Sequence, residues 1–189
     1  MSFLIWKKSR KAGQFNVEKL EWLNREHLKK ISNVQFLISN EVKKILRLRE
    51  DNKTKEILDK IAPIVLERIS KFGDIKEMAE REELAYFFQA PEYPKELLLW
   101  KKDKDENRTS ERLIKIREIL RGDFGDFASK EIKDRLMALA EKEGRGEVLW
   151  PLRVALSGRE KSPDPLALLE ILGKEQSLIR IDKAINILE

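Results

Sequence analysis

The sequence predicts an all-α protein built from two consecutive helical subdomains. Three observations lead to this fold class: apolar residues recur with helical periodicity, residues that cap helices precede these stretches, and one long polar run divides them. The polar run, KKDKDENRTS at 101–110, is the best candidate boundary. We therefore expect a helical bundle over residues 1–104 and a second helical subdomain over residues 105–189.

The first two helices are predicted at 16–30 and 34–48. Asn16 can cap the first helix through its side-chain oxygen. Apolar residues spaced by three or four positions indicate which face of a helix is buried. The predicted inward stripe of the first helix contains Val17, Leu20, Leu23, His27 or Leu28, and Ile31.

The next three helices are predicted at 54–69, at 74–88 and from 94 to 101. Pro63 falls inside the first of them and is expected to kink or break it, because proline removes a backbone donor. Asp74 and Glu77 have the spacing of a capping box, which predicts the start of the second.

Beyond the polar run, helices are predicted at 111–120, 129–143, 165–173 and 175–188. Gly144 and Gly173 stand where glycine commonly ends a helix, and Pro165 suits a first turn. The stretch 148–156 is ambiguous, because its alternating apolar residues fit a strand while Leu149, Leu152 and Leu156 fit a helix. We interpret it as a helix.

Composition and charge exclude several classes of protein. The chain has no cysteine, one histidine and no apolar run near the ~20 residues that a membrane helix needs, so we expect neither a metal site nor a membrane span. Its 39 basic and 34 acidic residues are unevenly distributed, with 15 basic and 8 acidic residues in 1–60. A basic section of this kind either follows a phosphate backbone or is an ordinary solvated helical surface.

Three segments then occur in the order typical of one family: FNVEKLEWLN at 15–24, ERISKFGDIKEMAEREELAYFF at 67–88 and GEVLWPLRVALSGREKSPDPLALLEILGKE at 146–175. Together they resemble the C-terminal, anticodon-binding half of bacterial glutamyl-tRNA synthetases. The resemblance implies that the second subdomain is a helix cage that binds an anticodon. It also implies a cytoplasmic, monomeric protein.

The catalytic motifs of that family have no counterpart in this sequence. The family has a His-Ile-Gly-His-type motif and a lysine loop that position ATP, whereas this chain has a single histidine, His27. We therefore expect no catalytic residue and no cofactor in this chain, and we interpret it as the C-terminal portion of a synthetase or as a separate domain. The parent that the resemblance implies uses ATP with Mg to join glutamate to tRNA.

The resemblance assigns anticodon contacts to Arg153, Ser162 and Pro163, and with less support to Pro165, where the family often has a bulky apolar residue. The planar fork of Arg153 can donate two hydrogen bonds to a base or stack on it. The alternative is an arginine paired with Glu147 or Asp164. Ser-Pro-Asp-Pro is also ordinary chemistry for the start of a helix.

Lys71 matches a position that the resemblance connects with the third anticodon base. Enzymes restricted to glutamate tRNA resemble one another in having arginine there, so lysine leaves both glutamate tRNA and glutamine tRNA as candidate partners. The alternative for Lys71 is an exposed lysine near the end of a helix, favoured by the helix dipole.

The remaining polar and aromatic candidates carry no functional assignment. The four tryptophans, among them Trp6 and Trp100, are not spaced as a stacking platform, and Trp22 and Trp150 are expected in the core. The acidic residues at 80–83 fit a solvated helix face better than a metal site.

Two functions from different classes follow. The first is a tRNA anticodon-binding module that acts in cis with a catalytic domain. The second is a helical adaptor that binds other proteins without reading RNA.

Overall fold

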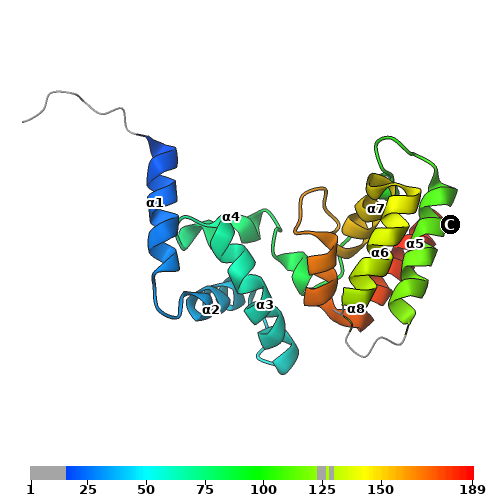
Figure 1. The fold of residues 1–189 in the computed structure, drawn as a ribbon. Coiled ribbons are helices and arrows are strands. Elements are labelled where there is room, and N and C mark those ends of the chain that lie inside the picture. The colour runs from blue at the N-terminus through cyan, green and yellow to red at the C-terminus, as the bar shows by residue number, and fades with distance from the viewer. Residues whose placement is uncertain (1–15, 123–126, 128–129) are drawn as a thin grey trace, which may run out of the picture.

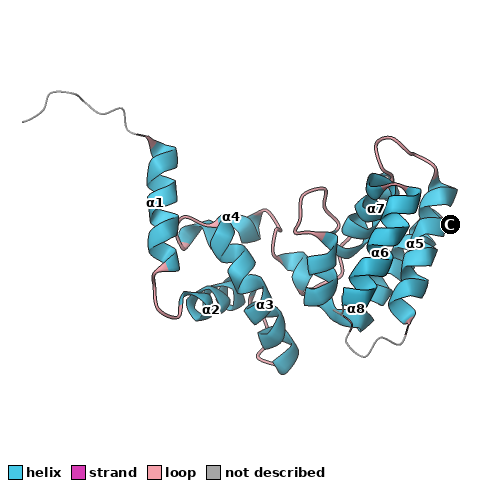
Figure 2. Cartoon of the chain, in the orientation of Figure 1, coloured by secondary structure: helices cyan, strands magenta, loops and turns pink. Residues whose placement is uncertain are grey.

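The computed structural model describes residues 16–122, 127 and 130–189, and within these residues it contains helices and no strand (Figure 2). The predicted all-α fold class is confirmed. Eight α-helices and two short 3₁₀ helices follow one another along these residues. They are α1 (Val17–Lys29), α2 (Val34–Leu46), α3 (Asn52–Arg68), α4 (Gly73–Glu80), η1 (Ala85–Phe87), η2 (Lys95–Leu98), α5 (Glu106–Arg121), α6 (Lys130–Glu143), α7 (Arg145–Ser157) and α8 (Pro165–Leu188).

In helices α1 to α4, which we call the N-terminal group, α2 packs against both α3 and α4, and α1 packs on α3 (Figure 1). The side chains of Ile38, Ile61 and Ile75, from α2, α3 and α4, are fully buried. Burying each such side chain contributes about 1.5–3 kcal/mol. The predicted cap of α1 is confirmed, because the Asn16 side chain accepts a hydrogen bond from the backbone N–H of Lys19 at 2.9 Å.

The predicted burial of the α1 stripe is wrong. Only Leu28 of this helix is buried, while Val17 and Trp22 are 55% and 56% exposed, and His27 is exposed as well. Periodicity shows which face of a helix is apolar, but the depth of burial depends on what packs there. Among the described residues, α1 packs mainly against α3 and leaves most of its apolar face uncovered.

Two details of α3 and α4 differ from the expectation. Helix α3 is continuous through Pro63, so the break that was one of the two predicted outcomes is absent, and buried residues on both sides of the proline, such as Ile61 and Val65, hold the helix in the core. Asp74 does not form a capping box, since its carboxylate accepts hydrogen bonds from the preceding residues 70 and 71. Helix α4 also ends at Glu80, and Glu82 then takes a left-handed conformation with φ 57°.

Helices α5 to α8, the C-terminal group, form a second bundle in which α8 packs against α5 and α7 (Figure 1). Leu113, Leu152 and Leu168 are fully buried there. Gly173 breaks the helical geometry within α8, with φ 73° and ψ 174°, so the two helices predicted at 165–173 and 175–188 are confirmed. The predicted start of α6 at residue 129 lies outside the described residues, as do Trp6 and the first 15 residues of the predicted N-terminal bundle.

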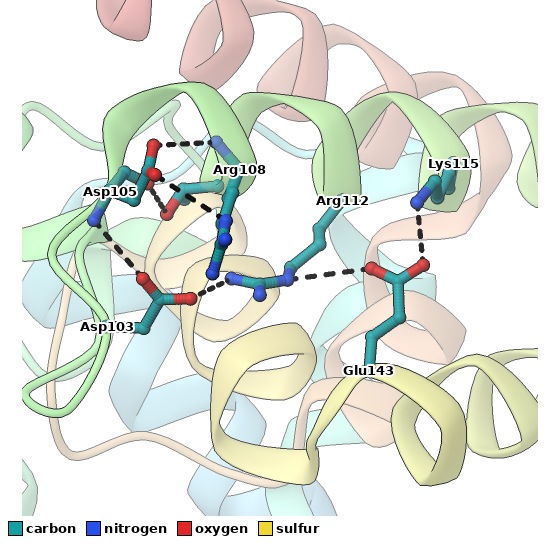
Figure 3. Close-up of polar contacts among 7 residues, drawn as sticks. Asp103, Asp105, Arg108, Arg112, Lys115 and Glu143 are labelled. Atoms are coloured by element: carbon teal, nitrogen blue, oxygen red, sulfur yellow. Dashed lines mark hydrogen bonds and ion pairs between the residues drawn. The ribbon is translucent and has the colours of Figure 1, made fainter.

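The polar run at 101–110 is not a free linker. Asp105 caps α5 by accepting from the backbone N–H of Arg108 at 3.1 Å, so residues 106–110 are already helical. Arg112 is buried beneath the run and donates to Asp103 at 2.7 Å, while its Nε lies 3.6 Å from a carboxylate oxygen of Glu143 (Figure 3). The run therefore packs on the C-terminal group, and η2 before it also contacts α7 and α8. The subdomain boundary at 104 and 105 stays a prediction.

Within the described ranges, no helix combines the length and the apolar character that crossing a bilayer requires.

Candidate nucleic-acid interface

Helix α7 positions the arginine that the sequence singled out. The interpretation of 148–156 as a helix is confirmed, and Pro151 lies inside it with its apolar neighbours Leu152 and Val154 fully buried. The helix ends at Gly158, whose φ of 67° is the left-handed conformation that glycine adopts most readily. The backbone N–H of Gly158 donates to the carbonyl of Val154 at 2.7 Å.

The chain then forms a short loop, 158–164, which leads into α8. Asp164 caps that helix by accepting from the backbone N–H of Leu166 at 2.9 Å. Pro165 occupies the first turn, where its missing N–H leaves no donor unsatisfied. This local chemistry explains the Ser-Pro-Asp-Pro sequence, and it holds whether or not the loop binds RNA.

The guanidinium of Arg153 reaches across and holds this loop. Its Nη1 donates to the carbonyl oxygens of Ser162 and Pro163, at 2.6 and 2.8 Å, and lies 3.2 Å from the Ser162 hydroxyl. The Ser162 hydroxyl in turn donates to the carbonyl of Pro163 at 3.2 Å. The structure thus brings three of the five predicted site residues into one contiguous surface.

Arg153 uses only part of its hydrogen-bonding capacity in these contacts. A guanidinium has five N–H donors, and all the hydrogen bonds that Arg153 donates to described residues come from Nη1. Its Nε and Nη2 are not among the buried nitrogen atoms that lack a partner. Among the described carboxylates none lies within ion-pairing distance of Arg153, so neither Glu147 nor Asp164 forms the pair that was the alternative.

The other two predicted residues lie elsewhere. Pro165 is buried at the start of α8 and presents no side chain on the surface. Lys71 is exposed in the turn between α3 and α4, and its Nζ lies 3.7 Å from a carboxylate oxygen of Asp74. Its side chain forms an ion pair with Asp74 and, among the described residues, no hydrogen bond or ion pair with Arg153 or with the 158–164 loop.

Asp74 shapes the turn that presents Lys71. Burial raises the pKa of the Asp74 carboxyl, but hydrogen bonds from the backbone and hydroxyl of Ser70 and from the backbone N–H of Lys71 outweigh this and lower the pKa below its ordinary 3.8. The carboxylate is therefore charged at neutral pH and holds the turn in one conformation.

Lys71 borders a groove of about 570 Å³ between α1 and α4. Its cationic lining residues are Arg25, Arg68, Lys71 and Arg81. Four carboxylates line the same groove, so its net charge is close to zero. Three of those carboxylates lie within 4.0 Å of Arg68, Lys71 or Arg81.

One aromatic pair was missed by the sequence reasoning. Trp100 and Trp150 lie with ring centroids 5.2 Å apart, although 50 residues separate them along the chain. Trp150 is half-buried rather than fully in the core, and its indole N–H donates to the carbonyl of Leu97 at 2.9 Å. The sequence did contain a signal for Trp150. It lies three residues before Arg153, and residues three apart share a helix face.

Trp150 lines a hollow of about 240 Å³. Leu97 and Leu99 line it too, with Lys101 and Lys104 from the polar run and Glu160 from the 158–164 loop. The lining of the hollow is therefore part apolar and part charged. Glu160 belongs to the same loop whose carbonyls Arg153 binds.

A family model described as an anticodon-binding domain matches residues 18–185. The glutamate–tRNA ligase of Clostridium acetobutylicum is 32% identical over 180 residues, which cover 93% of this chain and 35% of that protein. The glutamate–tRNA ligase of Chloroherpeton thalassium is 29% identical over an alignment 199 residues long, which covers 99% of this chain and 38% of the relative.

Solved structures give the same result. The glutamate tRNA ligase of Elizabethkingia meningosepticum, crystallised with its amino acid, superposes with a TM-score of 0.67 and 32% identity. That alignment covers 93% of this chain and 33% of the solved chain. The chain thus spans about a third of the length of the relatives that it matches.

Proposed function

The chain belongs to the anticodon-binding domain family, and from this premise we propose that it binds the anticodon loop of a glutamate tRNA as the non-catalytic part of a glutamate–tRNA ligase. The catalytic part, which would use ATP with Mg, is the portion of the relatives that this chain does not cover. The module binds, and the rest of the ligase performs the reaction.

The observation that carries this proposal is that only one of the three nitrogens of the Arg153 guanidinium donates hydrogen bonds to described residues. Its Nη1 is engaged with the loop carbonyls of Ser162 and Pro163, which fixes the plane of the guanidinium. Nε and Nη2 remain to donate to the edge of an unstacked base, and the flat face remains to stack on one. Base-edge contacts of this kind give specificity, whereas phosphate contacts only fix position.

The hollow beside Trp150 supports the same function. Single-stranded bases stack on aromatic side chains, and each such contact contributes about 1–3 kcal/mol. Lys101 and Lys104, which line the hollow with Trp150, are suited to the phosphates of the same nucleotides. We therefore propose that one anticodon base meets Arg153 while a neighbouring nucleotide approaches Trp150.

The uncovered apolar side chains of α1 and α2 support a further contact, with the catalytic part in cis. Apart from Val17 and Trp22, they include Phe36, which is 63% exposed. Exposed apolar side chains in this number are typical of a surface that contacts another body. A catalytic part of the same ligase resting there accounts for these residues without a separate adaptor function.

Binding to matched tRNAs tests the proposed function. The module is titrated with a glutamate tRNA and with the same tRNA carrying three altered anticodon bases, at one moderate salt concentration. We expect the unaltered tRNA to bind at least tenfold more tightly, since each lost base contact costs about 1–3 kcal/mol. Equal affinities would refute the function, and a protein pull-down insensitive to nuclease and to salt would favour the adaptor.

The choice between glutamate and glutamine tRNAs is expected to depend on Lys71. The variant Lys71→Arg adds a bidentate fork at a position where lysine is a point charge. We expect it to increase the ratio of affinities for glutamate over glutamine tRNA severalfold, measured with both tRNAs side by side. Lys76→Arg, on the exposed face of α4, is the matched control. An unchanged ratio of affinities in Lys71→Arg would show that Lys71 does not contribute to the choice between the two tRNAs.

A further inference from the structure

One arginine is buried with no acidic partner among the residues that the structure describes. Arg180, on α8, is 1% exposed. Burial lowers its pKa to about 10, which leaves it charged at neutral pH. Its hydrogen bonds run to three peptide carbonyls: Nη1 donates to Tyr86 at 2.7 Å and also to Leu156, and Nη2 donates to Gln89 at 3.2 Å.

A buried cation of this kind is a costly way to fill a core. Desolvating a guanidinium costs several kcal/mol, and an apolar side chain of similar volume is often neutral or stabilising in its place. Arg180 moreover leaves its Nε buried and unpaired. Its presence is better explained by what it connects than by the stability it adds.

The three carbonyls belong to two parts of the chain that are far apart in sequence. Tyr86 and Gln89 lie in the segment that leaves α4 through η1. Leu156 lies in the last turn of α7, immediately before the 158–164 loop. Arg180 therefore joins the segment that leaves the N-terminal group to the last turn of α7, from which the Arg153-bound loop departs.

Two more cations join the segment after α4 to the C-terminal group. Arg159, in the loop, donates to the carbonyl of Arg81 at the end of α4, at 2.9 Å. Lys183, one turn beyond Arg180, donates to the carbonyl of Pro91 at 3.0 Å. Unlike Arg180, both lie nearer the surface, so solvent competes for their hydrogen bonds.

We propose that Arg180 is a positioning residue, which locks the α4–η1 connection to the end of α7 and so holds the Lys71 turn at a fixed distance from the Arg153 loop. This link between the α4–η1 connection and the end of α7, which we call the Arg180 clamp, is a property of the protein alone. Its importance for RNA rests on the proposed function, because two contacts on one anticodon loop gain affinity from a rigid spacing that needs no adjustment on binding.

Spin labels measure this spacing directly, because the chain contains no cysteine to compete for them. The full chain carries Lys76→Cys on α4 and Lys142→Cys on α6, both exposed positions. We expect one narrow distance distribution between the labels. Arg180→Met, which keeps most of the volume and removes the donors, is expected to at least double its width. Arg180→Lys can still donate to some of the carbonyls, so its distance distribution is expected to be wider than that of the unchanged chain and narrower than that of Arg180→Met.

The matched control is Arg121→Met, which removes an arginine that pairs with Glu118 and Asp182 within the C-terminal group. It is expected to leave the distribution unchanged. A narrow distribution in a folded Arg180→Met variant overturns the proposal. So does loss of the helical circular dichroism in both Arg180 variants, because Arg180 would then be required for folding itself.

Titration with the glutamate tRNA separates the clamp from the function. Arg180→Met is expected to bind it about tenfold more weakly than the unchanged chain. Unchanged affinity despite a broadened distribution would show that the spacing has no role in recognition, and would overturn that half of the proposal. If the unchanged chain shows no anticodon preference, the proposed function fails, while the label distances still decide the clamp.

Discussion

Replacing Arg153 with alanine is expected to weaken binding of the glutamate tRNA by about tenfold to a hundredfold, which corresponds to about 1–3 kcal/mol. The variant loses the Nε and Nη2 donors that we propose for the edge of a base, and it also releases the loop carbonyls of Ser162 and Pro163 that Nη1 holds. The measurement is the affinity for the unaltered and the anticodon-altered tRNA over a series of salt concentrations. We expect the preference between the two tRNAs to fall, with the salt dependence nearly unchanged.

Two further variants show which property of Arg153 matters. Arg153→Lys keeps the charge and loses the fork, so it is expected to lose most of the preference as well. Arg108→Ala removes an exposed arginine on α5 whose ion pair is with Asp105, and it is expected to bind both tRNAs normally. A uniform loss of affinity for both tRNAs in Arg153→Ala, together with a smaller salt slope, would identify Arg153 as a phosphate contact instead.

Replacing Arg112 with alanine is expected to destabilise the fold by about 3 kcal/mol, measured as the free energy of unfolding in denaturant. The change leaves the carboxylates of Asp103 and Glu143 without the buried guanidinium that lies between them (Figure 3). Lys115→Ala is the matched control, because Lys115 pairs with the same Glu143 from a more exposed position. It is expected to cost less than about 1 kcal/mol.

The ion pair between Arg112 and Asp103 predicts that the free energy of unfolding depends on pH. The hydrogen bond from Arg112 lowers the pKa of Asp103 below its ordinary 3.8. A lowered carboxyl pKa contributes stability that is present above the unfolded value and is lost as the pH falls through the folded one. The difference between the unchanged chain and Arg112→Ala is therefore expected to narrow below pH 3.8. A difference that stays constant down to pH 2 would contradict the assigned role of Asp103.

The helices could be predicted from the sequence because their signals are local. Asn16, Asp164 and Pro165 act within one turn of the chain, and the structure confirms each of them as a helix start. Some errors are local, such as the capping box predicted at Asp74, and the others concern interactions between distant segments. The exposure of Trp22 depends on what covers α1, and the pairing of Trp100 with Trp150 depends on how η2 meets α7.

The candidate site divides in the same way. Arg153 and Ser162 are nine residues apart, so a helix followed by a short loop was sufficient to predict that they share a surface. Neither spacing nor composition could show that Nη1 would be occupied by loop carbonyls. Arg180 gave no signal at all, because its partners are backbone atoms, and the carbonyls of Tyr86 and Gln89 lie more than 90 residues earlier in the chain.

Under the proposed function, the hydrogen bonds from Arg153 to the 158–164 loop affect the rate at which the protein associates with RNA. They form within the protein, so the conformational entropy of that loop is already lost before any nucleic acid arrives. Docking then requires neither a folding step nor a gate that closes. Association of such a surface is limited by how often the two molecules collide in a suitable orientation, and selectivity appears in how long the correct complex survives.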